Sequence, residues 1–270
     1  MIELSITEKR EEIIDKIQEN LSVVAGGHPM LELGEIFEEL ASCFQALGSC
    51  NLLLYMDQDR FYGNLIYSGF TRRYFIKRSQ IEENRSDEHL AISRNESFFD
   101  VIAAGSFGLA REIVELSPKH WISDGEYEDD FAYYYFFHNY IQEFENSDKA
   151  KLNDILSQFE KSLEDDSSRR FNICKAFFNL EQECFQEEFN ELITEREAAK
   201  EREKPLLEYD ITFEPRKNIF VEGLALLNIA NKVGFETQKE YQYCPSIARI
   251  LAKKPLPEDI YIDVDQVIGR

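Results

Sequence analysis

The sequence lacks an excess of basic charge and long apolar runs. Its 270 residues carry 30 Lys and Arg against 52 Asp and Glu, so the formal net charge is −22. Phosphate groups are bound by basic surfaces, and this composition therefore disfavours a protein that binds nucleic acid or an anionic membrane. The longest apolar stretches, such as 52–55 and 133–137, are far too short to cross a bilayer, and the N-terminus has no signal-peptide pattern. We therefore expect a cytoplasmic protein.

Cysteine pairs and catalytic motifs are also missing. The five cysteines are widely spaced and include no CxxC pair, which favours reduced, buried thiols over a disulfide framework or a zinc knuckle. The four histidines are scattered, and HExxH, GxSxG, P-loop and GxGxxG patterns are absent. These absences predict a protein that is not an enzyme and holds neither a cofactor nor a metal.

Apolar and aromatic residues are plentiful. They make up 43% and 13% of the chain, which is enough for a sizeable core and excludes general disorder. The acidic charge is patterned along the chain, because nineteen of the 22 excess negative charges fall in residues 1–50 and 101–200. Such a distribution fits either good solubility or a basic partner, and composition alone does not choose between them.

Helical periodicity recurs along the chain, whereas alternation typical of β-strands is nearly absent. Helix 7–24 opens with Thr7 as its N-cap, and Gly234 suits the C-cap of the helix before it. Residues 209–213 are expected to form a short extended linker, followed later by a short helix over 246–252. The predicted helical segments are 7–24, 33–56, 60–83, a hairpin over 89–117, 126–145, 149–163, a pair over 168–200, and 217–233.

These segments predict an all-α bundle of stacked antiparallel helical hairpins. The hairpins at 98–116 and 171–193 are alike in pattern, but their spacing is not repeated, so the bundle is expected to be repeat-like without being a regular solenoid. We expect an N-terminal helical subdomain over 1–88, packed on a main helical domain over 89–270 in one continuous fold.

The densest acidic block is Asp124, Gly125, Glu126, Tyr127, Glu128, Asp129 and Asp130. One interpretation is local: Ser123 or Asp124 caps a helix and the following acids lie in its first turn, where the helix dipole favours them. A second, compatible interpretation is an acidic patch that faces a protein partner. Divalent-metal binding or acid–base chemistry by these carboxylates is the third.

An aromatic run follows the acidic block, from Tyr133 to Tyr140. Consecutive aromatic residues point around the whole helix, so this helix is either central or shares one face with a partner. We assign Phe131, Tyr134, His138 and Ile141 to the core. Tyr133 and Tyr140 lie on the opposite side and are predicted to be binding anchors, because tyrosine is enriched at protein interfaces.

The order of these features resembles the immunity protein 49 family, helical antidotes of bacterial polymorphic toxin systems. The resemblance covers about residues 89–250 and rests on apolar spacing and small residues. The residues that carry it are Phe98, Phe99, Ala103, Ala104, Gly105, Leu109, Ala110, Trp121, the block 124–130, Arg169, Arg170, Ile173, Cys174, Ala176, Phe177, Phe185, Phe189, Leu192, Glu222, Gly223, Leu224, Ala225, Leu226, Leu227, Ala230 and Gly234.

The resemblance implies that the chain binds and neutralises a cognate toxin domain. A strongly acidic surface suits a basic toxin, such as a nuclease, because its carboxylates stand in for phosphates. The predicted partner-binding residues are Asp124, Glu126, Tyr127, Glu128, Asp129, Asp130, Tyr133 and Tyr140. The competing hypotheses are a tetratricopeptide-like scaffold that binds a peptide, and a hydrolase with a carboxylate metal site at 124–130.

Overall fold

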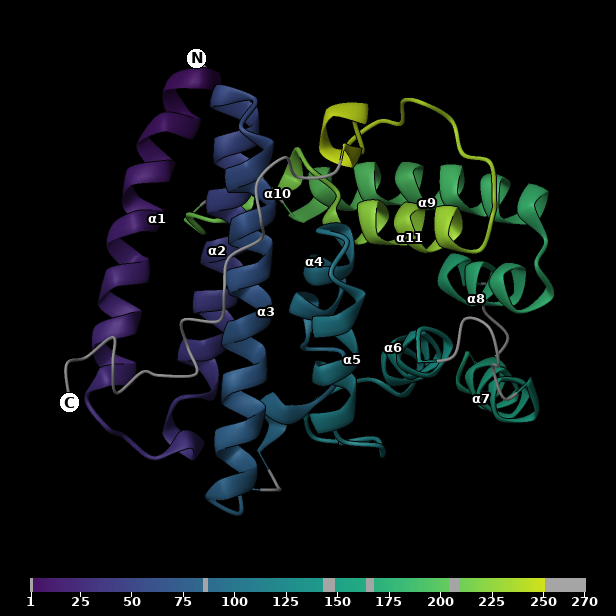
Figure 1. The fold of residues 1–270 in the computed structure, drawn as a ribbon, viewed down its shortest axis with the longest axis horizontal. Coiled ribbons are helices and arrows are strands. Elements are labelled where there is room, and N and C mark those ends of the chain that lie inside the picture. The colour runs from purple at the N-terminus through teal and green to yellow at the C-terminus, as the bar shows by residue number, and fades with distance from the viewer. Residues whose placement is uncertain (1, 85–86, 143–148, 164–167, 204–208, 251–270) are drawn as a thin grey trace.

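The chain folds into two blocks of helices whose axes run in different directions. The structure, a computed structural model, describes residues 2–84, 87–142, 149–163, 168–203 and 209–250. Helices α1 (Ile2–Ala25), α2 (Gly34–Tyr55) and α3 (Gln58–Ile81) lie side by side, and α9 and α11 run across their direction (Figure 1). The described residues contain no β-sheet, only an isolated bridge between Tyr241 and Cys244. The all-α prediction is confirmed.

A sharp reversal joins α2 to α3. Met56 ends α2 in the left-handed conformation at φ 53°, and its N–H donates to the carbonyl of Leu52, while the N–H of Asp57 donates to that of Asn51. Asp57 then caps α3, because its side chain accepts a hydrogen bond from the backbone N–H of Arg60 at 3.0 Å. These two local features make α2 and α3 antiparallel neighbours, as the stacked-hairpin prediction requires.

A short hairpin, α4 (Glu96–Ala103) and α5 (Phe107–Leu116), packs against α3. Gly105 makes the turn with φ +78°. Gly69 of α3 allows the close approach, because a Cβ atom there would lie 2.1 Å from Cγ1 of Val101. The hairpin therefore lies between the N-terminal helices and the rest of the chain.

The C-terminal half contains α6 (Glu128–Tyr140), α7 (Lys149–Ser162), α8 (Arg169–Asn179), α9 (Gln182–Glu203), α10 (Phe213–Lys217) and α11 (Val221–Lys232). Helix α6 packs on α7 and α8, α8 packs on α9, and α11 packs on α4. The helices range from five residues in α10 to 24 in α1 and α3, so no fixed repeat length appears among the described elements.

Most predicted helices are confirmed, and their ends differ. Thr7 is not an N-cap, because α1 already begins at Ile2. The first arm of the predicted hairpin over 89–117 starts only at Glu96, since residues 88–90 form a 3-10 helix (η2) and residues 91–95 a turn. Residues 217–233 are split between α10 and α11, and Gly234 has the left-handed φ of +87° expected after a helix.

The 3-10 helix η2 is held by Arg72, a residue of α3 that is itself buried. Its guanidinium donates hydrogen bonds to the carbonyls of His89, Leu90 and Ala91. Arg72 thus satisfies backbone acceptors that no helix ladder covers, whereas neighbouring Arg73 makes an ion pair with Glu112 of α5.

Candidate functional site

The acidic block lies partly in a loop before α6 and partly in the first turn of α6. Trp121 donates a hydrogen bond from its indole Nε1 to the carbonyl of Glu126 at 2.9 Å. The Glu126 carboxylate accepts hydrogen bonds from the backbone N–H groups of Ser93, at 2.9 Å, and Ile122, at 3.4 Å. Gly125 packs so closely that a Cβ atom there would lie 2.7 Å from the carbonyl oxygen of Glu88. The loop is therefore fixed against the η2 segment.

The predicted cap at Ser123 or Asp124 is wrong, because α6 begins later than expected. Its N-cap is Tyr127, which makes no side-chain capping bond. Glu128, Asp129 and Asp130 do occupy the first turn, where the helix dipole favours acidic side chains. The predicted end of this helix over 143–145 falls outside the described residues.

Tyr133 and Tyr140 are not surface anchors, which corrects the sequence prediction. Their exposed fractions are 0% and 6%, because α6 is enclosed by α4, α7 and α8. The Tyr133 hydroxyl donates to Glu222 of α11 at 2.8 Å, and the Tyr140 hydroxyl donates to the carbonyl of Phe177 at 3.2 Å. Both tyrosines belong to the core, as do Tyr134, Ile141 and His138, which were predicted there.

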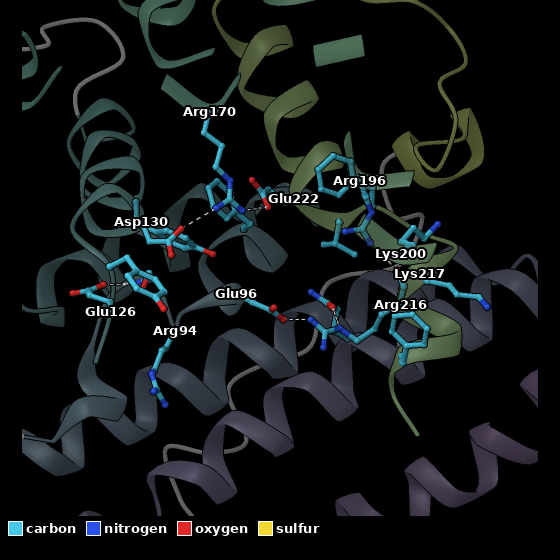
Figure 2. A pocket seen from close by; sticks show the side chains of 18 of the residues that line it. Arg94, Glu96, Glu126, Asp130, Arg170, Arg196, Lys200, Arg216, Lys217 and Glu222 are labelled. Carbon is cyan, nitrogen blue, oxygen red and sulfur yellow. Dashed lines mark hydrogen bonds and ion pairs between the residues drawn. The ribbon is translucent and has the colours of Figure 1, made fainter. Parts of the chain in front are cut away.

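Asp130 is also held by the fold. Arg170 of α8 lies between Asp130 and Glu222, donating at 3.0 and 3.1 Å, and its guanidinium lies 4.7 Å from the ring centre of Tyr133 (Figure 2). The attraction of Glu222 raises the pKa of Arg170 above its usual value. Burial raises the pKa of Asp130, and the nearby Arg170 opposes that shift. Arg170 thus joins α6, α8 and α11.

The remaining charged and aromatic members of the block face outward together with the preceding Trp121, and we call these residues the acidic face: Trp121, Asp124, Tyr127, Glu128 and Asp129. Tyr127 is 78% exposed and Trp121 is 42% exposed. Asp124 and Glu128 are exposed, and Asp129 is half-buried. Within the described ranges, none of these three carboxylates makes an ion pair. The acidic face therefore combines uncompensated charge with aromatic surface.

Beside the acidic face lies the central cleft, a cavity of about 820 Å³ between α2 and α4 on one side and α6 and α8–α11 on the other. Six basic side chains and six acidic ones line it, although the whole chain is strongly acidic. Figure 2 shows Arg196, Lys200, Arg216 and Lys217 at one end, and Glu126 and Asp130 at the other. Arg94 and Arg170 also lie near Glu126 and Asp130, so the cleft has one basic end and one end of mixed charge, which composition alone does not reveal.

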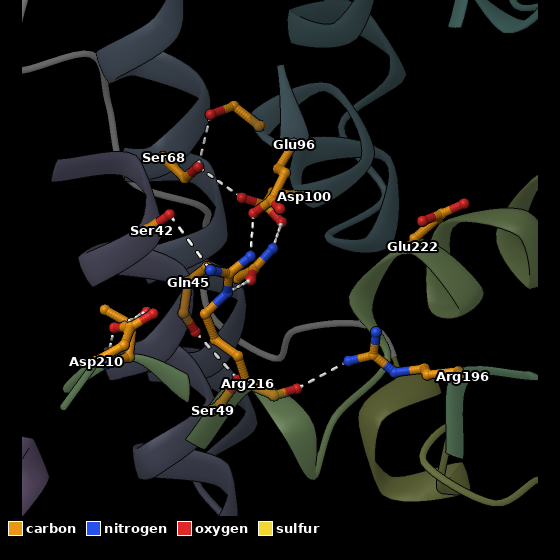
Figure 3. A network of polar contacts seen from close by, with 12 residues as sticks. Ser42, Gln45, Ser49, Ser68, Glu96, Asp100, Arg196, Asp210, Arg216 and Glu222 are labelled. Carbon is orange, nitrogen blue, oxygen red and sulfur yellow. Dashed lines mark hydrogen bonds and ion pairs between the residues drawn. The ribbon is translucent and has the colours of Figure 1, made fainter. Parts of the chain in front are cut away.

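A buried polar network extends from the cleft into the N-terminal block (Figure 3). Asp100 of α4 accepts hydrogen bonds from the Gln45 amide and, at 2.6 Å, from the Ser68 hydroxyl. Gln45 in turn accepts from Arg216, which also pairs with Glu96. Burial raises the pKa of Asp100 to about 7, although both hydrogen bonds act in the opposite direction. The network connects α2, α3, α4 and α10.

Sequence reasoning did not find the cleft. Gln45 and Arg216 are 171 residues apart, and nothing local indicates that they meet. Asp100 offers one usable signal, because it is a single acid between Phe98-Phe99 and Val101-Ile102. An acid on the apolar side of a helix predicts a buried, hydrogen-bonded carboxyl group.

The hypothesis of a metal centre finds no geometric support in the part of the chain that the structure describes. No three His, Cys, Asp or Glu side chains there are grouped so that they could hold an ion. Glu126 and Asp130 point toward different partners, as described above. The five cysteines are unbridged, and all except the half-buried Cys184 are buried. No described helix has both the length and the apolar character needed to span a membrane.

Comparison with known proteins gives no relative for this chain. No family model, no curated protein and no solved structure matches it significantly. The resemblance to the immunity protein 49 family therefore stays a prediction that depends on the residues quoted above.

Proposed function

We propose that this chain is an immunity protein that binds a cognate bacterial toxin domain in the cytoplasm and neutralises it without catalysing a reaction. The observation that carries the proposal is the acidic face. Its Asp124, Glu128 and Asp129 carboxylates have no ion pair among the described residues, and Trp121 and Tyr127 stand exposed beside them. The loop that presents them is fixed by Glu126.

Such a surface has the chemistry needed to hold a basic protein. Uncompensated carboxylates attract a positively charged partner and speed its encounter, while exposed aromatic side chains supply contact area that is buried on binding. A fixed loop loses little conformational entropy when it binds. A basic nuclease domain fits this surface best, because its phosphate-binding groups accept carboxylates in place of phosphates.

The structure narrows the predicted contact residues. Glu126 and Asp130 already bind groups of their own chain, and Tyr133 and Tyr140 are buried. We therefore limit the proposed partner-binding surface to the acidic face and treat those four residues as its support.

The decisive experiment is growth rescue. The gene adjacent to this one is expressed alone and together with the full chain. We expect the neighbouring product alone to stop growth and co-expression to restore it. A neighbouring product that is harmless, or toxicity that no co-expression relieves, would contradict the proposal. A harmless product that still binds the chain stably would favour the tetratricopeptide-like adaptor instead.

Charge reversal tests the surface itself. The triple variant Asp124→Lys, Glu128→Lys and Asp129→Lys should slow association with the toxin domain, and the defect should shrink at high salt, because screening weakens steering. The matched control reverses Glu181, Glu183 and Glu187, three exposed acids of the loop before α9 and of its start. Both triple variants change the net charge equally. Equal association rates for the two would show that the toxin contacts another surface.

A further inference from the structure

The basic end of the central cleft contains one arginine that forms no ion pair with the carboxylates of the described chain. Arg216 pairs with Glu96, Lys217 pairs with Glu214 at 2.6 Å, and Arg170 lies between two carboxylates. Arg196 of α9, in contrast, makes no ion pair with any described carboxylate. In a chain with 22 more acidic than basic residues, this is an unexpected position for an uncompensated cation.

The contacts of Arg196 hold its side chain in place without pairing its guanidinium with a carboxylate. One terminal nitrogen donates to the carbonyl of Arg216 at 3.1 Å, and the guanidinium lies 4.5 Å from the ring centre of Phe220. Its Nε atom is buried and has no hydrogen-bond acceptor. Burial also lowers the pKa of Arg196, and the attraction of Glu222 opposes that shift only in part.

A buried charged donor without an acceptor costs free energy, and an anion that reaches it recovers that cost. The guanidinium is planar and presents several N–H groups, which match the spacing of two oxygens on a carboxylate or a phosphate. The group that best completes this end of the cleft is therefore an oxyanion.

We propose that the Arg196 end of the central cleft binds the carboxylate or phosphate group of a small organic molecule, whose body lies along the cleft wall. The cavity of about 820 Å³ is comparable with the ~300–1,000 Å³ of small-molecule sites. Aromatic side chains of Phe99, Tyr134, Phe213 and Phe220 contribute to the lining and suit an apolar or flat body. The proposal does not depend on toxin binding, although Asp124 and Tyr127 of the acidic face also line the central cleft.

The primary test observes Arg196 directly in the full-length protein without any partner. Arginine Nε–H signals are followed by NMR while inorganic phosphate, and in a second series benzoate, is added at constant ionic strength set with sodium chloride. We expect a saturable shift of the Arg196 signal, identified by its loss in Arg196→Lys. A shift with phosphate alone indicates a phosphoryl ligand, one with benzoate alone a carboxylate, and one with both an oxyanion recognised by charge and shape.

Affinity in variants separates binding from a structural role. Arg196→Gln should bind the same probe about 10–100-fold more weakly, since it removes a charged hydrogen-bond donor. Arg111→Gln is the matched control, because Arg111 is also half-buried and donates to a carbonyl, that of Ile141 at 3.2 Å, outside the cleft. If Arg196→Gln fails to fold, Arg196→Lys takes its place and should bind with reduced affinity. Shifts that never saturate, or that affect all arginines alike, would overturn the proposal, as would unchanged affinity in a folded Arg196→Gln.

Discussion

The acidic face and one part of the cleft wall come from the same short stretch of sequence, residues 121–130, yet the carboxylates of this stretch have opposite surroundings. Glu126 binds backbone N–H groups and Asp130 binds Arg170, whereas Asp129 has no ion pair among the described residues. Adjacent residues of a helix differ by roughly 100° in direction, so Asp129 and Asp130 face different environments. The density of acids in a sequence therefore does not define a binding surface. The partners that each carboxylate already has within the fold define it.

The largest contrast is expected between two tyrosines of this region. Tyr133→Ala removes a fully buried ring and its hydrogen bond to Glu222, and should lower the free energy of unfolding by about 4 kcal/mol. Tyr127→Ala removes a mostly exposed ring and should change it by less than about 0.5 kcal/mol. Urea unfolding followed by circular dichroism measures both. Similar losses of unfolding free energy in the two variants would contradict the assignment of Tyr133 to the core and of Tyr127 to the exposed surface.

The second prediction concerns the pH dependence of stability through Asp100. Its pKa in the folded state is raised to about 7, so between pH 4 and 7 the folded chain keeps a proton that the unfolded chain releases. Stability should therefore fall as pH rises through this range, by on the order of 4 kcal/mol for a shift of about three units. Above pH 7 this contribution stays constant.

Asp100→Asn isolates that effect, because asparagine keeps the shape of the side chain and does not titrate. Between pH 4 and 7 the natural chain should lose stability through Asp100, whereas the variant should not. The unfolding free energy of the variant should therefore rise relative to that of the natural chain across this range. The exposed Asp124→Asn serves as the reference, since it lies in the same chain without such burial. A difference for Asp100→Asn that does not change with pH would refute a raised pKa at this position.

A smaller effect is expected at Arg170. Arg170→Gln leaves Asp130 and Glu222 without the cation between them, and should cost about 2 kcal/mol, less than the ~3–5 kcal/mol typical of fully buried pairs. The neighbouring Arg169→Gln breaks a half-buried ion pair with Glu188 and an exposed one with Glu195, and should cost less stability than Arg170→Gln, because Arg169 joins only α8 and α9. Thermal and urea unfolding of the two variants provide the comparison. A greater loss in Arg169→Gln would show that the clamp at Arg170 does not join the three helices.

The positions of most helices were predictable, because apolar residues spaced three and four apart indicate a helix with one buried face. Helices α2 and α3 differ from their predicted ends by only one or two residues. Helix α6 has no such sidedness, since Tyr134 and His138 are buried in addition to Tyr133, Phe136, Phe137 and Tyr140, and together these side chains cover most of its circumference. A prediction from helical periodicity therefore places Tyr133 and Tyr140 on an exposed side, although α6 has almost no exposed side.

The candidate site was predictable only where it is local in sequence. The exposed part of the acidic block needed no knowledge of distant residues. The clamp at Arg170 and the network at Arg216 join side chains separated by 40 to 171 residues, and such pairs depend on how the helices pack. Arg196 looks like an ordinary surface arginine among the charges of α9, and only its place against Phe220 and the Arg216 carbonyl sets it apart.

The attachment of Arg72 to the η2 segment has a mechanical consequence for the acidic face. Arg72 fixes residues 89–91, and that segment in turn supports Gly125 and Glu126. A force applied to the acidic face is therefore transmitted to α3 through the hydrogen bonds of buried Arg72. Helix α3 itself contributes no residue to the acidic face. The N-terminal helices therefore support the loop at 121–127, which lies in the other half of the sequence.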